Sequence, residues 1–267
     1  MEQMVVIQEL RKIFNRNTID EKAAIDGVGL EIEKGEFVTV IGSNGAGKTT
    51  LLNLLAGTCL ADEGRIFIDD KEVTLLPEHR RAKYLGRIFQ NPLMGTASSM
   101  TIEENLSMAE LRGTRRGLSW GVTKRQRRRY KELLSTLELG LESRLSDRVS
   151  LLSGGQRQCL TLLMATLSLP KLLLLDEHTA SLDPKTAEKV IDLTNRIVRE
   201  NRLTTIMVTH NMLQAINFGD RMIMLHEGKI QFDVAGDEKS CLTVEAVVRR
   251  FGEKLEDETL LCKPVTE

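Results

Sequence analysis

Residues 42–49 have the composition and spacing of a loop that binds phosphate. They read Gly-Ser-Asn-Gly-Ala-Gly-Lys-Thr and lie between a predicted strand and a predicted helix, which is the context that this pattern requires. The glycines let backbone N–H groups wrap phosphate oxygens, and the start of the helix adds a favourable dipole. We expect Lys48 to reach the β- and γ-phosphates of a nucleotide and the hydroxyl of Thr49 to bind Mg²⁺. The context disfavours the competing interpretation, a glycine turn that merely joins strand to helix.

A pair of acids follows a buried-strand pattern farther along the chain. Asp176 and Glu177 come directly after the leucines at residues 172–175. A carboxylate at a strand end can hold Mg²⁺ directly or through water, and a neighbouring one can polarise a water for attack on a γ-phosphate. We assign the first role to Asp176 and the second to Glu177. The alternative is that two acids simply solvate a strand end, and the phosphate loop makes this the weaker interpretation.

Two adjacent glycines stand just before another predicted helix, in the segment Leu-Ser-Gly-Gly-Gln at residues 152–156. A glycine pair there costs backbone entropy, which indicates that another molecule approaches the main chain. Ser153 and the N–H groups of Gly154 and Gly155, at the start of a helix, form an anion site suited to a γ-phosphate.

The bulk composition narrows the class of protein. The chain has 267 residues, 41% of them hydrophobic and 28% charged, which suits one large α/β domain or a domain with a sizeable subdomain. A formal net charge of −1 argues against a protein that coats nucleic acid, so we expect no nucleic-acid partner.

The four cysteines are scattered, which excludes a zinc ribbon of the usual spacing and fits the cytoplasm. No apolar run approaches the roughly 18–20 residues of a membrane span, and the first residues do not read as a secretory signal.

Apolar alternation and turn residues predict the elements that position these side chains. Strands are expected at residues 4–10, 27–32, 37–41, 86–89 and 204–208, with hairpins at 64–73 and 221–232. A helix should run from the phosphate loop to Gly57, and Asp183 followed by Pro184 predicts the start of another. Residues 91–153 have helical periodicity, more arginine and few strand signals, so they are assigned to a helical insertion.

Together with the arginine and glutamine that follow it, the glycine-pair segment resembles the signature motif of ATP-binding cassette (ABC) ATPases. The other landmarks of that family occur here in the family's order. Gln90 matches the Q-loop, which implies contact with Mg²⁺ and the attacking water. Asp183 lies in a stretch similar to the D-loop, and His210 matches the switch histidine that contacts the γ-phosphate. Phe14 falls where the family has an aromatic ring that stacks on adenine.

The resemblance covers roughly residues 4–235 and implies a fold, ligands and site residues. The implied fold class is α/β, a P-loop NTPase core (residues 1–90 and 154–235) with an antiparallel β-subdomain, an inserted helical subdomain (91–153) and a short C-terminal tail (236–267). The implied ligands are ATP and Mg²⁺. The implied ATP-binding residues are Phe14, Gly42, Ser43, Asn44, Gly45, Ala46, Gly47, Lys48, Thr49 and Thr50. The implied catalytic residues are Glu177, His210 and Gln90, and the implied Mg²⁺ ligands are Thr49, Gln90 and Asp176. The implied signature residues are Ser153, Gly154, Gly155 and Gln156.

Several of these residues have a plainer alternative. Phe14 could belong to the core, His210 could be a satisfied histidine at a strand end, and Gln90 could be a surface amide. The basic run at residues 124–129 reads as a solvated helix face, with contact to anionic lipid headgroups as the functional alternative.

The sequence departs from the family pattern at three places. Position 178 is histidine where proline usually follows the catalytic glutamate, and Ala180-Ser181 inverts the common Ser-Ala order of the D-loop. Phe14 stands where tyrosine is more frequent. None of these changes removes a group that hydrolysis needs.

The resemblance also implies partners. In the family, the signature loop of one subunit covers the nucleotide on the phosphate loop of another, so we expect a head-to-tail homodimer. The chain contains no second cassette, long coiled coil or fused membrane domain. We therefore expect separate permease chains docked near Gln90 and residues 91–110, an extracytoplasmic solute-binding protein, and a place on the cytoplasmic face of the membrane.

The function expected from these features is ATP hydrolysis that drives solute uptake. Residues 176–180 also resemble a bacterial importer branch linked to aromatic amino acids and similar solutes. The alternative is a non-transport ABC ATPase that assembles soluble complexes or signals across the membrane. A regulatory protein that binds ATP without turnover is a third possibility, against which Glu177 and His210 argue.

Overall fold

The computed structural model describes residues 2–113 and 121–251. It divides into two compact units, the first made of Met1–Arg81 with Arg202–Glu267 and the second of Ala82–Asn201, each as far as its residues are described. Both units combine sheets and helices, which agrees with the expected α/β class. The expected domain boundaries at residues 91, 154 and 236 stay predictions.

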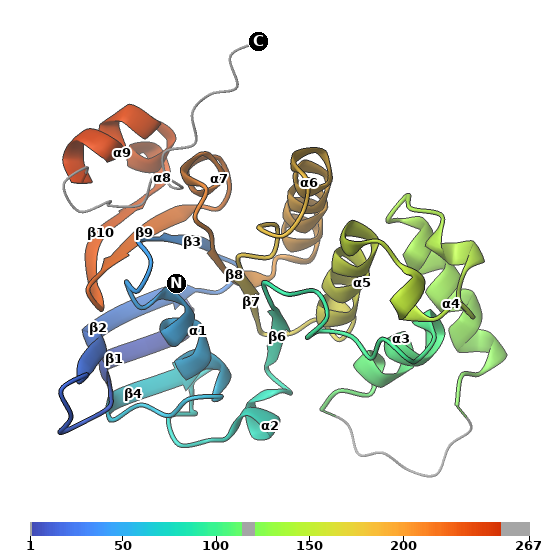
Figure 1. Cartoon of the computed structure of the whole chain (residues 1–267), viewed down its shortest axis with the longest axis horizontal. Coiled ribbons are helices and arrows are strands. Elements are labelled where there is room, and N and C mark those ends of the chain that lie inside the picture. Colours follow the sequence, from blue (N-terminus) through green and yellow to red (C-terminus); the bar gives the residue numbers. More distant parts are fainter. Residues whose placement is uncertain (1, 114–120, 252–267) are drawn as a thin grey trace. The chain divides into compact units, whose positions relative to one another are not determined.

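An antiparallel sheet occupies the N-terminal part of the first unit (Figure 1). Its strand order is β2 (Lys22–Glu33), β1 (Gln3–Phe14), β4 (Glu63–Ile68) and β5 (Lys71–Glu72). In the register, Ile7 of β1 lies opposite both Leu30 of β2 and Ile66 of β4. β1 and β2 are longer than expected because β1 passes through a bulge near Glu9, where φ is +45°, and continues beyond it.

A second group of strands in this unit centres on β3 (Phe37–Ile41). β3 pairs in parallel with β8 (Thr204–Val208) on one side and with β9 (Arg221–His226) on the other. Every residue of β3 and β8 is buried, as expected for parallel strands covered on both faces. β9 turns at Glu227 and Gly228, both with positive φ, into the antiparallel β10 (Lys229–Ala235). This hairpin confirms the sequence prediction.

The helix that follows the phosphate loop, α1 (Lys48–Ala56), is fixed at its C-terminal end by a buried arginine. Arg81 ends the short helix α2 (Glu78–Arg81) and is fully buried. Its guanidinium donates to four backbone carbonyls: Leu54 (2.5 Å), Leu55 (3.0 Å), Leu76 (2.7 Å) and Thr74 (2.9 Å). Burial lowers the pKa of Arg81 to about 10, so the group stays charged at neutral pH. A cation at this end of α1 also complements the helix dipole.

The segment expected only as a tail contains two helices, α8 (Gly236–Ser240) and α9 (Val244–Phe251). Val247 of α9 is buried in a cluster with Ile41 of β3 and Met212 of α7 (Met212–Asn217). Lys239 of α8 donates to the carbonyls of Ile216, Phe218 and Gly219 at the end of α7. These contacts attach the segment to the first unit.

The second unit contains the parallel strand pair β6 (Leu85–Ile88) and β7 (Leu172–Asp176). Its main helices are α3 (Ile102–Glu110), α4 (Lys124–Ser135), α5 (Gly154–Thr166) and α6 (Pro184–Asn201), with 3₁₀ turns η1 (Leu141–Ser143) and η2 (Val149–Leu151). α3 and α4 belong to the stretch in which helical periodicity was seen. Asp183 caps α6 through its carboxylate, which accepts from the amide of Thr186 (3.1 Å), and Pro184 is the first helical residue, both as predicted.

Replacing Arg81 with leucine should lower the free energy of unfolding by about 3 kcal/mol or more, because four buried carbonyls lose their donor. Urea unfolding followed by circular dichroism measures the change. The matched control is Arg80→Leu on the same helix, where the side chain is exposed and the effect should stay within about 0.5 kcal/mol. Equal effects of the two variants would contradict this role for Arg81.

Candidate functional site

The phosphate loop passes so close to other backbone segments that two of its positions can hold only glycine. A Cβ at Gly42 would lie 2.2 Å from the carbonyl oxygen of Leu225, and one at Gly47 would lie 2.3 Å from that of Ala24. Both glycines also have positive φ, +152° and +105°, which L side chains rarely adopt. The glycines of this loop are therefore required by packing within the first unit as well as by any ligand.

The side chains of the loop are arranged for phosphate. Lys48 is buried, and its Nζ donates to the carbonyls of Gly42 (2.7 Å) and Ser43 (3.0 Å). Asn44 and Thr49 are exposed, and α1 begins at Lys48. The loop thus brings together a lysine, a hydroxyl and a helix N-terminus, which are the groups that bind an anion such as phosphate.

Two more predicted residues belong to the first unit. The ring of Phe14, at the end of β1, is 42% exposed, so it is not a core side chain; Nζ of Lys12 lies 5.5 Å from its centroid. His210 follows β8, and the amide of Thr209 donates to Val40 at the end of β3 (3.1 Å). His210 and the phosphate loop therefore leave the same edge of the parallel strands, where α/β proteins bind ligands.

Asp176 ends β7 and is paired with an arginine that the sequence analysis did not single out. Nη2 of Arg87 lies 3.5 Å from Oδ2 of Asp176, and both side chains are largely buried. The guanidinium also lies over the ring of Phe89, 4.6 Å from its centroid. The available signal was the arginine itself, a charged residue inside a predicted buried strand, placed by period-two alternation on the same face as Phe89.

Glu177 and Gln90 meet inside the second unit. Nε2 of Gln90 donates to Oε2 of Glu177 (3.2 Å), and the hydroxyl of Ser181 donates to the backbone carbonyl of Gln90 (3.4 Å). Glu177 has a φ of +43°, a left-handed conformation that costs a non-glycine residue about 1–3 kcal/mol. The residue matched to the Q-loop, the candidate catalytic glutamate and the serine of the D-loop-like stretch are thus in direct contact.

His178, which stands in place of the family's proline, is buried. Its Nε2 lies 3.0 Å from the hydroxyl oxygen of Thr194 on α6. Burial lowers the pKa of His178 to about 4, so the ring is neutral at neutral pH. The sequence marked the position as a departure from the family but gave no indication of its partner.

The start of α5 is capped by the signature residues. The hydroxyl oxygen of Ser153 accepts from the amide of Gln156, and the amide of Ser153 donates to the side chain of Gln156, both at 3.2 Å. This is a capping box. The cap uses Ser153 as an acceptor, which leaves its hydroxyl proton for an anion.

The two glycines of this segment have different reasons to lack a side chain. A Cβ at Gly155 would lie 2.2 Å from Cγ2 of Thr186 at the start of α6, whereas one at Gly154 would meet only Leu182, at 3.5 Å. Packing against α6 is therefore sufficient reason for glycine at position 155, and the approach of another molecule to its backbone stays a prediction. Gly154 is exposed and stays available to a partner.

Asp183 has a structural role, because its carboxylate caps α6. Hydrogen bonds from the side chain and the backbone of Thr186 hold the pKa of Asp183 below its usual range. Its expected part in the D-loop stays a prediction, since the cap shows only its local role.

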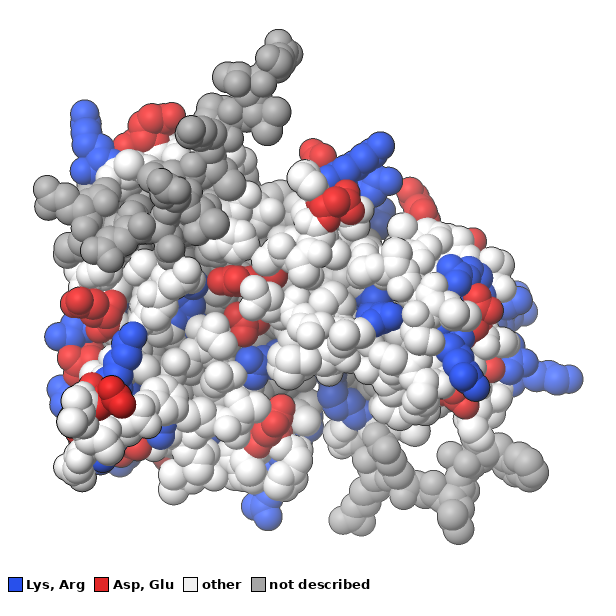
Figure 2. All heavy atoms as spheres, in the orientation of Figure 1, with Lys and Arg blue, Asp and Glu red and all other residues white. Residues whose placement is uncertain are grey.

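The basic run forms one side of α4, where lysine and arginine side chains gather (Figure 2). Arg127 makes two 2.7 Å hydrogen bonds to Glu103 of α3, and Arg129 pairs with Glu110 of the same helix. Lys124 and Arg125 are exposed. Part of the run therefore joins two helices, and contact with anionic lipid stays a prediction.

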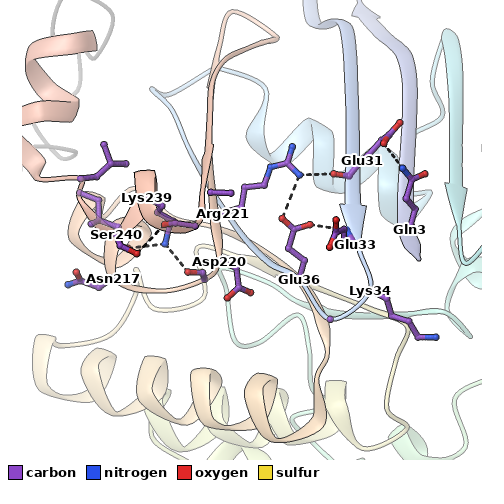
Figure 3. A pocket seen from close by; sticks show the side chains of 16 residues that line it. Gln3, Glu31, Glu33, Lys34, Glu36, Asn217, Asp220, Arg221, Lys239 and Ser240 are labelled. Carbon is purple, nitrogen blue, oxygen red and sulfur yellow. Dashed lines mark hydrogen bonds and ion pairs between the residues drawn. The ribbon is translucent and has the colours of Figure 1, made fainter. Parts of the chain in front are cut away.

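A polar cavity of about 1110 Å³ lies at the opposite, N-terminal end of β3 (Figure 3). Carboxylates and cations line it, but they bond to the chain itself: Asp220 accepts from the amide of Phe37 (2.9 Å), and Lys239 donates to three carbonyls at and just after the end of α7. Ligands of parallel sheets bind at the carboxyl ends of strands, so this cavity is not the nucleotide site.

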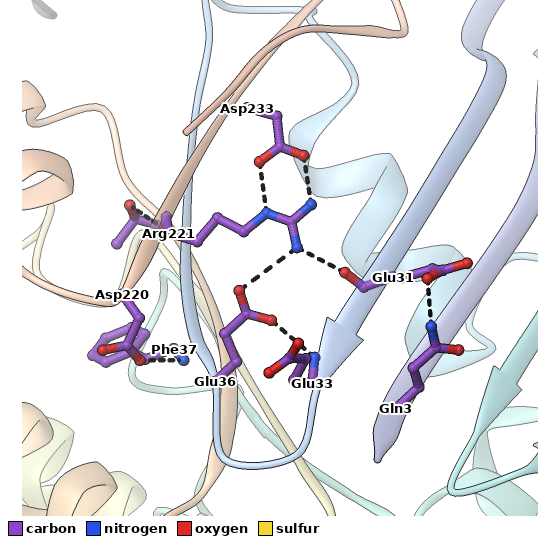
Figure 4. Close-up of polar contacts among 9 residues, drawn as sticks. Gln3, Glu31, Glu33, Glu36, Phe37, Asp220, Arg221 and Asp233 are labelled. Atoms are coloured by element: carbon purple, nitrogen blue, oxygen red, sulfur yellow. Dashed lines mark hydrogen bonds and ion pairs between the residues drawn. The ribbon is translucent and has the colours of Figure 1, made fainter. Parts of the chain in front are cut away.

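Arg221 at the start of β9 organises the wall of this cavity (Figure 4). It makes a two-pronged ion pair with Asp233 of β10 (2.6 and 2.5 Å), donates to the carbonyl of Glu31 (2.8 Å) and approaches Glu36 (3.6 Å). The cluster joins β2, β9 and β10 and the turn before β3, which is a structural role.

Comparisons with known proteins agree with these features. Residues 25–180 match the family model described as ABC transporter. The chain is 45% identical over 248 residues to the tyrosine transport ATP-binding protein of Clostridioides difficile (strain R20291), which covers 93% of this chain and 98% of that protein. It is 33% identical over 230 residues to a putative hemin import ATP-binding protein, HrtA, of Staphylococcus aureus (strain bovine RF122 / ET3-1), with 85% and 98% covered.

A solved structure gives the same result. The dimeric structure of an ATP-binding cassette in a post-hydrolysis state, bound to ADP and Pi, matches with a TM-score of 0.74 and 29% identity, covering 87% of this chain and 98% of that chain. Among the residues that the structure describes, no helix combines the length and apolar character of a membrane span.

Alanine at the two signature glycines should separate packing from function. Gly155→Ala should destabilise the fold by about 1–3 kcal/mol, because the added methyl overlaps Thr186. Gly154→Ala should leave stability within about 0.5 kcal/mol and still lower ATPase activity, because the methyl protrudes where a partner's phosphate would approach. Thermal unfolding and phosphate release measure the two effects. Full activity of a folded Gly154→Ala variant would show that nothing approaches this position.

Proposed function

Because the chain belongs to the ABC transporter family and is an ATPase, we propose that it is the nucleotide-binding subunit of a solute uptake transporter, active as a homodimer on permease chains. The observation that carries the proposal is the open start of α5. Ser153 and Gly154 are exposed there, and the capping box leaves the Ser153 hydroxyl proton for an anion. Such a surface is useful when the nucleotide comes from a second copy.

The first unit binds ATP in this proposal. Lys48 donates to two neutral carbonyls, and phosphate oxygens are stronger acceptors for an ammonium group. The lysine therefore turns to the β- and γ-phosphates when ATP binds. The N–H groups of residues 42–50 surround the phosphates, and the exposed ring of Phe14 stacks on adenine.

The residues also suit Mg²⁺, which prefers oxygen ligands and is usually held by one or two carboxylates together with phosphates. Asp176 supplies a largely buried carboxylate whose charge Arg87 balances. Thr49 supplies an exposed hydroxyl, and Gln90 supplies an amide oxygen. When bound, Mg²⁺ neutralises charge on the phosphates.

Hydrolysis rests on two side chains in the proposal. Glu177 polarises the attacking water, and its hydrogen bond with Gln90 orients the carboxylate that accepts the proton. His210 contacts the γ-phosphate. ATP closes the dimer because its phosphates supply contacts that are absent without it, and loss of the γ-phosphate reopens it.

The permease would dock on residues 91–110, where large apolar side chains are exposed. Leu93 and Met94, which are adjacent in sequence, and Met108 are 52%, 67% and 39% exposed, and exposed apolar side chains of this size suit an interaction surface. This contact would hold the subunit at the cytoplasmic face of the membrane, with a solute-binding protein delivering the substrate from outside. The 45% identical relative is named for tyrosine transport, so we propose tyrosine or a related amino acid as the solute.

Replacing Glu177 with glutamine should abolish turnover and trap ATP. The amide cannot accept the proton of the attacking water, so ATP stays intact and the dimer stays closed. Size-exclusion chromatography with Mg²⁺ and ATP should show a dimer for this variant, and phosphate release should fall to background.

The control for the trapped dimer adds Ser153→Arg to the same variant. The arginine blocks the second copy but lies outside the phosphate loop, so a fluorescent ATP analogue should still bind a monomer. A Glu177→Gln protein as active as wild type would remove Glu177 from the mechanism. A dimer that persists with Ser153→Arg would place the interface elsewhere.

The substrate is tested by uptake in cells that carry the Glu177→Gln chain in place of wild type. Uptake of labelled tyrosine should fall to the level of a strain without the gene, while uptake of labelled methionine stays unchanged. Normal tyrosine uptake with loss of another solute would overturn the proposed substrate and leave the ATPase assignment intact.

A further inference from the structure

Glu177 begins a turn in a strained backbone conformation, which needs support from the surrounding structure. Glu177 has a φ of +43°, and its carbonyl accepts from the amide of Ala180 (3.0 Å). This bond closes a turn, but turn geometry is defined by the φ and ψ of the two central residues, His178 and Thr179, and does not set φ of Glu177. A non-glycine residue persists in the left-handed region only where its surroundings enforce it.

The surroundings of the next residue are tightly defined. His178 is 1% exposed and Thr194 is completely buried. The hydroxyl of Thr194 donates its only proton to the carbonyl of Val190 (2.7 Å), so the 3.0 Å contact with His178 has the ring Nε2–H as donor. The tautomer and the direction of the ring are therefore both fixed.

Thr194 is itself held by a helix that is anchored. It lies within α6, whose first turn is capped by Asp183 and whose residue Thr186 packs against Gly155 of α5. The bond from His178 thus ties the strained turn to the interior of an 18-residue helix. All of these contacts lie within the second unit.

We propose that His178 is a positioning residue which, through Thr194, holds the backbone of Glu177 in the left-handed conformation that directs its carboxylate to Nε2 of Gln90. The inference rests on the proposed function, in which Glu177 acts on the attacking water. It gives a purpose to the histidine at position 178, where proline would restrict φ covalently but offer no bond to α6.

A purely structural role for His178 predicts a different effect on turnover. If His178 only fills space, loss of its hydrogen bond lowers stability and leaves turnover per folded molecule unchanged. A positioning role lowers kcat without a matching change in KM for ATP, because ATP is bound by the phosphate loop and not by this turn.

Thr194→Val tests the proposal, because it removes the acceptor and keeps the shape of the side chain. In the Mg²⁺-ATP assay of the assembled protein, kcat should fall about three- to tenfold, the range expected for one buried hydrogen bond. KM for ATP should change less than about twofold on the same grounds. Thr194→Ser keeps the hydroxyl and should restore kcat.

The matched control is Thr166→Val on α5. Thr166 is also buried and also donates to a helix carbonyl, that of Leu162 (2.9 Å), but it has no histidine partner among the described contacts. Its kcat should remain at the wild-type level. Equal losses in Thr166→Val and Thr194→Val would overturn the proposal, and so would a folded Thr194→Val protein with normal kcat.

A double-mutant cycle with His178→Leu tests whether Thr194 acts through its hydrogen bond with His178. If the two side chains act through their mutual bond, Thr194→Val should cause no further loss in the His178→Leu background. Full additivity would overturn the proposal. The two hypotheses can fail separately. An active Glu177→Gln protein would show that Glu177 is not catalytic and would overturn the proposed function. An inactive Glu177→Gln protein together with a Thr194→Val protein of normal kcat would overturn the positioning role alone.

Discussion

The constraint on which the first unit depends is the close approach of three stretches of main chain around the phosphate loop. The carbonyls of Leu225 and Ala24 occupy the space that a side chain at Gly42 or Gly47 would need. β3, β9 and β2 must therefore keep their spacing for the loop to exist, and the loop in turn sets where α1 begins. A loop held by backbone on both sides presents its N–H groups to phosphate without having to be ordered at binding, which reduces the entropic cost.

Buried or half-buried cations fix the elements around this loop. Arg81 holds the C-terminal end of α1, Lys239 holds that of α7, and Arg221 joins the strands at the end of β3 that lies away from the loop. Each bonds to backbone carbonyls, and Arg221 also bonds to carboxylates, so the cost of burying its charge is offset. The charges at the amino end of the strands are satisfied by the chain itself. At the carboxyl end, Lys48 donates to the carbonyls of its own loop, and the exposed Asn44 and Thr49 stand beside it.

Features that depend on neighbouring residues could be predicted from the sequence. The phosphate loop, the turn at Glu227 and the cap at Asp183 all follow from residue types a few positions apart. Features that depend on which helix packs where could not. The close contact of Gly155 with α6 and the packing of Val247 into the first unit's core join residues that the sequence does not connect. Resemblance to a family supplied the expected roles of the site residues but not these contacts, because a motif assigns roles to positions and does not say which side chains pack together.

In the second unit, the Glu177–Gln90 contact and the start of α5 differ in what surrounds them, although the motifs assigned both to one nucleotide site. Glu177 and Gln90 are hydrogen-bonded to each other and follow neighbouring parallel strands, so this contact is made within one chain. The start of α5 is different: its cap is complete, its second glycine is closed by α6, and only Ser153 and Gly154 face outward. Completion of this surface by a second nucleotide-bearing copy belongs to the proposed function. The two glycines therefore differ in their surroundings: packing within the chain requires glycine at position 155, whereas Gly154 is exposed.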